Sequence, residues 1–216
     1  IVGDDVHHIS RVMRMDAGDE LIVSCSETGE TAHGKITEIS SEAVHVDIVE
    51  WLETTNELPV RVAIANGLPK GDKLELVIQK GTELGAFMFI PFNAARSIVK
   101  WDDKKGHKKV ERWNKIAKEA AEQSHRSTIP KVGSPISFKE LLSTSEQWDH
   151  KVVAYEEDAK SGEKSSFSAT LNQVKKGESI LIVVGPEGGL TEKEVEILKE
   201  HGFKSCAAIS YHLELL

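Results

Sequence analysis

One short stretch near the end of this chain constrains its fold more than any other feature. Residues 180–184 are consecutively apolar, and residues 185–191 then read Gly-Pro-Glu-Gly-Gly-Leu-Thr. The apolar run predicts a buried strand, and the capping-box spacing of Thr191 and Glu194 predicts that a helix begins there. In open α/β sheets ligands bind beyond the carboxyl ends of strands, and glycine lets the backbone approach a ligand closely. The loop is therefore a candidate ligand site, although an ordinary tight turn is the alternative.

From residue 60 onward, the apolar pattern alternates between that of strands and that of helices. Leu74, Val77 and Ile78 have helical spacing within 73–84, and a longer helix is expected over 108–123. The other expected elements are strands at 60–65, 87–91, 151–155 and 179–184, and helices at 138–142 and 191–201. Such alternation is typical of an α/β fold, in which helices cover a mostly parallel sheet.

The first 57 residues have a different pattern. Short strands separated by turns are expected at 20–25, 35–40 and 43–49, which suggests a small β-barrel. Residues 53–59, a mainly polar stretch that ends in proline, are interpreted as a linker. We therefore expect one domain over 1–57 and a second over 58–216. Because the chain begins with Ile rather than Met, the first domain is expected to be incomplete at its N-terminus.

The net charge is −8, but the charge is unevenly distributed. Residues 1–58 contain three Lys or Arg against thirteen Asp or Glu, whereas residues 96–131 contain eleven against five. Binding of a polyanion depends on the local density of positive charge rather than on the net charge of the whole chain. The segment 96–131 is therefore a candidate nucleic-acid-binding surface. The solvated face of a helix is the alternative.

Composition argues against several classes of protein. No apolar run approaches the roughly 18 residues that a membrane span requires. The two cysteines, Cys25 and Cys206, have no Cys or His cluster around them, so we expect no metal site and a reducing, cytoplasmic location. The chain contains neither a G-x-G-x-x-G sequence after a strand nor a P-loop. This argues against an α/β enzyme that binds a dinucleotide or a nucleoside triphosphate.

Residues 185–191 resemble the GPEGG-[FL]-[ST] signature of the RsmE family of RNA methyltransferases. Further segments that are similar to this family follow in the same order along nearly the whole chain. They are His8 with 11–14, residues 67–73, 79–85, 95–97 and 112–113, and residues 119–126 with Pro130.

The resemblance implies a fold, an activity and partners. Residues 1–57 would form a PUA-like β-barrel that helps to grip RNA. Residues 58–216 would form a SPOUT methyltransferase domain, an α/β sheet whose C-terminal portion threads a trefoil knot. The enzyme would bind S-adenosylmethionine (SAM) in the knot, act as a homodimer in the bacterial cytoplasm, and methylate N3 of a specific uridine in 16S RNA of the small ribosomal subunit, without a metal.

The resemblance also implies roles for individual residues. The SAM loop would consist of Gly185, Pro186, Glu187, Gly188 and Gly189. Thr82 and Glu83 would shape the substrate side of the pocket, or else cap and pack their helix. The candidate RNA-binding residues are Arg11, Arg14, Arg96, Arg112, Gln123 and Arg126, with surface solvation, ion pairing or helix capping as alternatives. Arg126 is also the candidate catalytic residue, and no general base is identified.

The sequence departs from the family at one place. Between Ala207 and Ala208 it lacks the family's L-G-x-R-I-L-R-x-E-T-A segment, which carries much of the SAM pocket and an arginine. Either the segment has been lost, or residues of the natural protein are missing from the printed sequence. A true loss favours the alternative function, a non-catalytic RNA-binding or ribosome-assembly protein of the same fold.

Overall fold

The computed structural model describes residues 1–25, 28–52, 56–98, 103–155 and 165–207. The chain divides into two compact units, which are described separately. The first unit comprises residues 1–57 together with 125–128, and the second comprises 58–124 together with 129–216.

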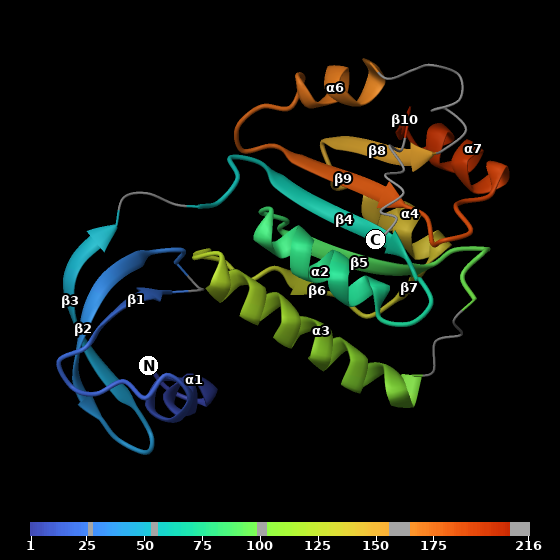
Figure 1. Ribbon diagram of the computed structural model, residues 1–216. Helices are drawn as coiled ribbons and strands as arrows, with labels where there is room; N and C mark the ends of the chain where they lie inside the picture. The colour runs from blue at the N-terminus through green and yellow to red at the C-terminus, as the bar shows by residue number, and fades with distance from the viewer. Residues whose placement is uncertain (26–27, 53–55, 99–102, 156–164, 208–216) are drawn as a thin grey trace, which may run out of the picture. The chain divides into compact units, whose positions relative to one another are not determined.

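The second unit is built on a seven-stranded sheet in which every strand pair is parallel (Figure 1). The strand order is β10-β8-β9-β4-β5-β6, and β7 also pairs with β5. The strands are β4 (Arg61–Gly67), β5 (Met88–Asn93), β6 (Lys131–Val132), β7 (Ile136–Ser137), β8 (His150–Tyr155), β9 (Ser179–Val184) and β10 (Lys204–Ala207). The prediction of an α/β fold with a mostly parallel sheet is confirmed.

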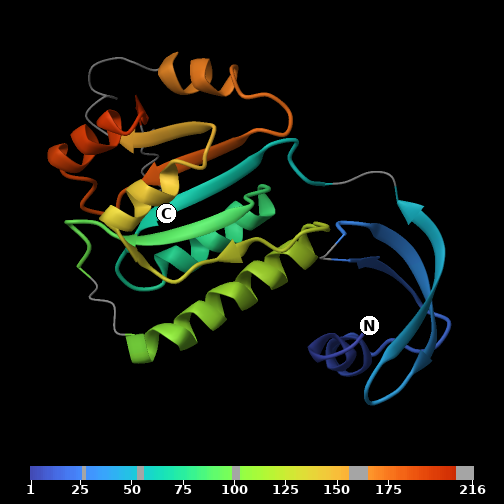
Figure 2. The ribbon, with the colours of Figure 1, turned by 180° about the vertical axis from the view of Figure 1, so that it is seen from behind.

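Helices cover both faces of this sheet (Figures 1 and 2). On β4, Ala63 and Ala65 face one core with α4 and α7, whereas Ile64 faces the other with α2 and α3, as the period of two in a strand requires. The helices are α2 (Lys73–Glu83), α3 (Asp103–Gln123), α4 (Phe138–Ser145), α6 (Ser165–Leu171) and α7 (Glu192–Glu200).

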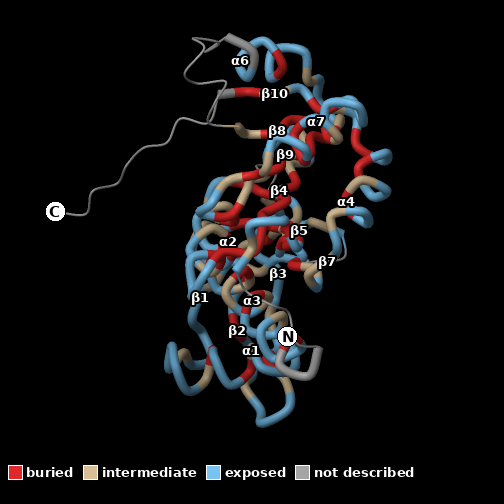
Figure 3. The backbone as a smooth tube through the Cα atoms, turned by 90° about the vertical axis from the view of Figure 1, so that its right-hand side faces the viewer, coloured by how far each residue is buried: buried red, intermediate tan, exposed pale blue. Residues whose placement is uncertain are grey.

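Strand β9 shows why its residues are continuously apolar. Leu181 and Val183 pack into the core beside α4 and α7, while Ile180 packs on the opposite face with Val152 and Cys206. Figure 3 shows buried residues concentrated along β4, β5 and β9 of this unit. A strand that is covered on both faces has no solvated side, so no polar residue alternates along it.

Some elements differ from the sequence-based expectation. Helix α3 begins at Asp103 rather than 108, because the first turns contain Gly106 and no apolar residue whose spacing could reveal a helix. The short strands β6 and β7 and helix α6 were not expected. Residues 208–216 lie outside the described residues, and the trefoil knot stays a prediction.

The first unit contains a curved, three-stranded antiparallel sheet in the order β1-β2-β3. Val6, Ile9, Ile36 and Val44 form its small core. Strand β2 begins four residues before the predicted position, directly after the turn that ends at Glu30. The elements are α1 (Asp4–His7), the π-helical turn η1 (His8–Val12), β1 (Glu20–Ser24), β2 (Thr31–Ile39) and β3 (Val44–Leu52). A closed barrel over 1–57 stays a prediction.

Candidate functional site

The glycine-rich loop lies at the carboxyl end of β9, in the middle of the sheet (Figure 1). The N–H of Gly189 donates to the carbonyl of Pro186 at 2.7 Å, which closes a tight turn. Gly189 has a φ of 68°, a left-handed conformation that favours glycine. A Cβ on Gly185 would lie 2.7 Å from the backbone nitrogen of Leu190, so the loop folds back too closely for a side chain there. The loop therefore presents mainly backbone at this edge of the sheet.

The start of α7 anchors the loop to its neighbours. Thr191 and Glu194 form the predicted capping box, with Glu194 accepting hydrogen bonds from the backbone and hydroxyl of Thr191 at 2.8 Å each. The buried carboxylate of Glu194 also accepts from the N–H of Ala95 at 2.8 Å. One carboxylate therefore caps α7 and holds the segment that follows β5.

Glu187 joins the loop to the segment that follows β4. Its carboxylate oxygens accept from the N–H of Lys70 at 3.1 and 3.2 Å, and one lies 3.1 Å from Nζ of Lys73. A hydrogen bond from its own backbone, together with those from Lys73 and Lys70, holds the pKa of Glu187 below its ordinary value although burial opposes this. Glu187 therefore stays ionised at neutral pH and is engaged by two lysine residues.

Arg96 joins the loop to the segment that follows β5. Its Nη1 donates to the carbonyl of Gly188 at 2.8 Å and to that of Leu190 at 3.4 Å. The loops after β4, β5 and β9 thus converge at the carboxyl edge of three adjacent strands. The structure brings Arg96, a predicted RNA contact, against the predicted SAM loop. Lys70, Lys73 and Glu194 were not predicted as site residues, and only the capping-box spacing of Glu194 signalled a local role.

Two other predicted residues line a groove of about 450 Å³ between α2 and α3. Glu83 and Gln123 are both part of its lining, together with Glu75, Gln79 and Glu119. The lining contains several carboxylates, of which Glu75 pairs with Nη2 of Arg112 at 2.7 Å and Glu83 pairs with Nζ of Lys80 at 2.8 Å. Thr82 is fully buried, which places it in the helix packing rather than on the groove.

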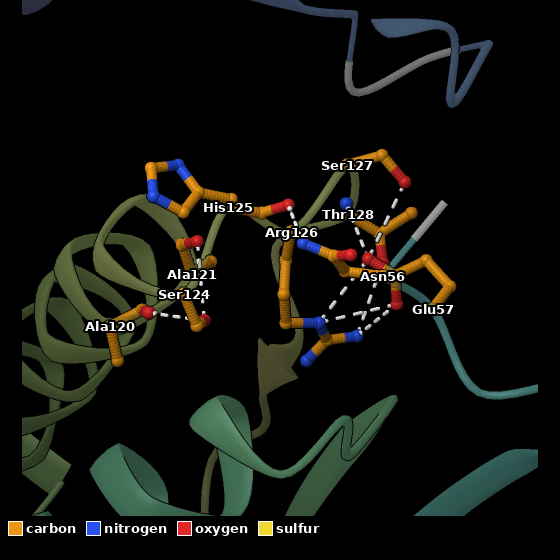
Figure 4. A network of polar contacts seen from close by, with 9 residues as sticks. All are labelled: Asn56, Glu57, Ala120, Ala121, Ser124, His125, Arg126, Ser127 and Thr128. Carbon is orange, nitrogen blue, oxygen red and sulfur yellow. Dashed lines mark hydrogen bonds and ion pairs between the residues drawn. The ribbon is translucent and has the colours of Figure 1, made fainter. Parts of the chain in front are cut away.

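Arg126 pairs with Glu57, a residue of the same unit (Figure 4). Its side chain is only 2% exposed, and its Nε lies 3.2 Å from each carboxylate oxygen of Glu57. The same carboxylate accepts from the backbone N–H of Thr128 at 3.0 Å. The predicted catalytic arginine is therefore paired internally with a residue that was expected to belong to a linker. No local sequence signal marked Glu57 as its partner.

The two remaining predicted arginines, Arg11 and Arg14, lie at the end of η1 and just beyond it, and both are exposed. Arg11 lines a second groove, of about 700 Å³, in the first unit, together with Val6, His7 and Met15. Arg14 has a φ of 55°, an uncommon left-handed conformation for a residue other than glycine. Neither groove is lined by residues of the 185–189 loop.

The described residues contain no group of three or more His, Cys, Asp or Glu side chains arranged to hold a metal ion. Within the same residues, every helix is too short or too polar to cross a membrane.

Comparison with known families assigns both parts of the chain. Residues 56–208 match the family described as RNA methyltransferase domain, and residues 1–49 match the family described as RNA methyltransferase PUA domain.

Individual proteins are similar over most of the chain. A Bacillus subtilis protein named ribosomal RNA small subunit methyltransferase E is 52% identical, with all of this chain and 91% of the relative aligned. That alignment spans 233 residues whereas the chain has 216, so the relative carries residues within it that this chain lacks.

Two solved structures are similar in fold and were determined with SAM. A ribosomal RNA small subunit methyltransferase E from Neisseria gonorrhoeae is 25% identical with a TM-score of 0.80, covering 96% of this chain and 81% of that one. A methyltransferase from Legionella pneumophila is also 25% identical, with a TM-score of 0.79 and coverage of 95% and 81%.

Proposed function

This chain belongs to the ribosomal RNA small subunit methyltransferase E family of RNA methyltransferases, and from that premise we propose that it transfers the methyl group of SAM to N3 of a uridine in 16S ribosomal RNA. The observation that carries the proposal is the backbone-lined loop 185–189 at the carboxyl end of β9, within the segment that matches the RNA methyltransferase family.

The loop suits a cofactor that is held by backbone groups. Because Gly188 and Gly189 carry no side chain, a ligand can approach the backbone of the loop closely, at the place where α/β sheets bind ligands. We propose that the backbone of 185–189 binds SAM, whose sulfonium supplies an activated methyl group. The ion pair between Glu187 and Lys73 supports the shape of this loop.

The proposed chemistry is mainly one of positioning. Uracil N3 lies on the Watson–Crick edge, so the base has to be unpaired or splayed out before it can reach the methyl group. The chain then has to align N3 with the methyl group and exclude water. Because the guanidinium of Arg126 is buried against Glu57, we propose that Arg126 holds the 125–128 loop rather than taking part in the reaction itself.

We assign the grip on RNA to two regions. Exposed cations on α3, namely Lys108, Lys109, Arg112 and Lys115, would contact phosphates, and the PUA domain with Arg11 and Arg14 would add a second contact. Arginine suits phosphate because its planar fork binds two oxygens at once. We further propose that 1–57 forms a closed PUA-like barrel and that 58–216 forms a knotted SPOUT domain, which pairs as a homodimer in the cytoplasm.

One observation favours a second candidate function. The Bacillus subtilis relative carries residues that this chain lacks, and the family's arginine-containing segment is absent between Ala207 and Ala208. If the natural protein also lacks them, we propose that it binds ribosomal RNA or assists ribosome assembly without methylating it.

One experiment separates the two functions. Purified protein of known intact mass is incubated with labelled SAM and small ribosomal subunits from cells that lack this modification, and nucleosides are analysed by mass spectrometry. We expect 3-methyluridine, a mass above 23.8 kDa, and a peptide in a digest of the same protein that carries the segment after Ala207. RNA binding without methyl transfer, at a mass of 23.8 kDa, would support the non-catalytic function. Methylation of a ribose 2′ oxygen would contradict the assignment to N3.

A further inference from the structure

We propose that Arg96 is a positioning residue for the SAM loop, so that it controls affinity for SAM rather than affinity for RNA. The inference rests on the proposed function, because it assigns loop 185–189 to SAM. Arg96 is the first residue of the basic segment 96–131, and the proposal gives it a different role from that of the exposed cations on α3.

The backbone of Arg96 is held on both sides. The N–H of Ser97 donates to the carbonyl of Ala94 at 3.0 Å, and the N–H of Ala94 donates to the hydroxyl of Ser97 at 3.2 Å, which closes a turn around Arg96. The preceding N–H, that of Ala95, donates to the buried carboxylate of Glu194 at 2.8 Å. The side chain of Arg96 therefore leaves from a fixed point beside the start of α7.

From this point the guanidinium reaches a single peptide group of the SAM loop. Nη1 of Arg96 donates to the carbonyl of Gly188 at 2.8 Å. The N–H of the same peptide group, that of Gly189, donates to the carbonyl of Pro186 at 2.7 Å. Because a peptide group is planar, fixing its oxygen and its nitrogen fixes its orientation. Arg96 thus holds one end of the peptide group, and the turn holds the other.

The glycines at 188 and 189 explain why the loop needs this contact. A Cβ on Gly188 would lie 3.4 Å from Cβ of Arg96, at the short end of ordinary contact, so the arginine packs directly against the loop. Glycine also gives the backbone more freedom than any other residue. Without the bond from Arg96, the Gly188–Gly189 peptide is expected to reorient more readily, so that loop 185–189 keeps the shape proposed to bind SAM for less of the time.

The first measurement is made on the full chain and its Arg96→Ala variant. SAM affinity is determined by calorimetry without RNA, and RNA affinity by fluorescence anisotropy with a small-subunit RNA fragment without SAM. A hydrogen bond from a charged donor typically contributes enough to predict a roughly tenfold weaker SAM affinity. RNA affinity should change less than twofold. Arg96→Lys, which keeps the charge and one donor, should recover part of the SAM affinity.

The matched control is Lys139→Ala, which removes an exposed cation from α4 in the same unit. It should change neither affinity. Unchanged SAM affinity in Arg96→Ala, or a drop in RNA affinity as large as the drop in SAM affinity, would overturn the proposal. If Arg96→Ala does not fold, the same comparison is made with Arg96→Lys, which should still bind SAM less tightly than the wild type.

A second readout does not depend on SAM. Amide hydrogen exchange of residues 185–191 should be faster in Arg96→Ala than in the wild type, because the turn opens more often. Equal exchange rates would show that Arg96 does not hold the loop. If the wild type binds no SAM, the proposed function fails, whereas the exchange measurement still decides whether Arg96 positions the loop.

Discussion

Arg126 and Glu57 form a nearly enclosed ion pair although 69 positions separate them in the chain. The guanidinium side chain is 2% exposed and the carboxylate side chain 19%. Glu57 also accepts hydrogen bonds from Ser127 and Thr128, so one carboxylate binds three successive residues of the loop that follows α3 (Figure 4). This explains why residues 125–128 belong to the first unit although the residues on either side belong to the second.

Removing the carboxylate of this pair should destabilise the protein strongly. Glu57→Ala removes the carboxylate that pairs with a buried guanidinium, and we expect the free energy of unfolding to fall by about 3 kcal/mol. Urea unfolding followed by circular dichroism measures this. Glu119→Ala is the control, because its exposed pair with Lys115, at 3.8 Å, should contribute less than about 0.5 kcal/mol. Similar losses in the two variants would contradict the importance of the buried pair.

The same pair predicts a dependence of stability on pH. Burial by itself raises the pKa of Glu57, but hydrogen bonds from Arg126 and Thr128 and the charge of Arg126 outweigh it, so the pKa lies below its ordinary value of 4.5. A lowered pKa in the folded state means that the stabilisation is present above pH 4.5 and is lost as the pH falls through the folded value. The difference in free energy of unfolding between the wild type and Glu57→Gln should therefore shrink as the pH falls through the folded-state pKa of Glu57. A difference that is constant from pH 7 to pH 3 would argue against this assignment.

The two capping boxes of the second unit should differ in their contribution to stability. Glu140 caps α4 through Ser137 alone and is exposed, whereas the buried Glu194 caps α7 and also holds Ala95. Glu194→Ala should reduce the free energy of unfolding by about 2 kcal/mol, because it removes the shared acceptor of two partly buried backbone hydrogen bonds. Glu140→Ala should have a smaller effect. Thermal unfolding of both variants tests the order, and a larger loss in Glu140→Ala would reverse the interpretation.

Because the end of β4 lies against the loop after β9, we expect that Gly67 cannot be replaced by a larger residue without loss of stability. In Gly67→Ala the new Cβ would lie 2.6 Å from Cδ and 2.8 Å from the backbone nitrogen of Pro186, and the backbone cannot yield easily. We expect a loss of about 2 kcal/mol and weaker SAM binding, because the SAM loop would shift. Gly133→Ala is the matched control, since its Cβ would meet only the carbonyl oxygen of Phe89 at an ordinary 3.8 Å. Calorimetry gives both the unfolding temperature and the SAM affinity, and equal behaviour of the two variants would argue against a close contact.

Local signals in the sequence were sufficient for much of the second unit. The continuous apolar run predicted β9 with the bounds that the structure shows, 179–184. The spacing of Thr191 and Glu194 predicted the capping box, because both members lie within one helical turn. Alternating strands and helices predicted the parallel sheet. The predicted helix was shorter than α3, because hydrophobic periodicity cannot reveal a helical turn that contains no apolar residue.

By itself, the sequence thus determined the class of fold, the family and the position of the glycine-rich loop, since these depend on neighbouring residues and on the order of motifs. Tertiary structure alone decided the partners of the charged residues. Arg96 meets Gly188 across 92 positions, and Glu187 meets Lys70 across 117. These contacts exist because β9, β4 and β5 are adjacent and parallel, which brings the loops after them to one edge. An arginine carries the same charge whether it binds RNA, a carboxylate or a backbone carbonyl, and only the folded chain selects among them.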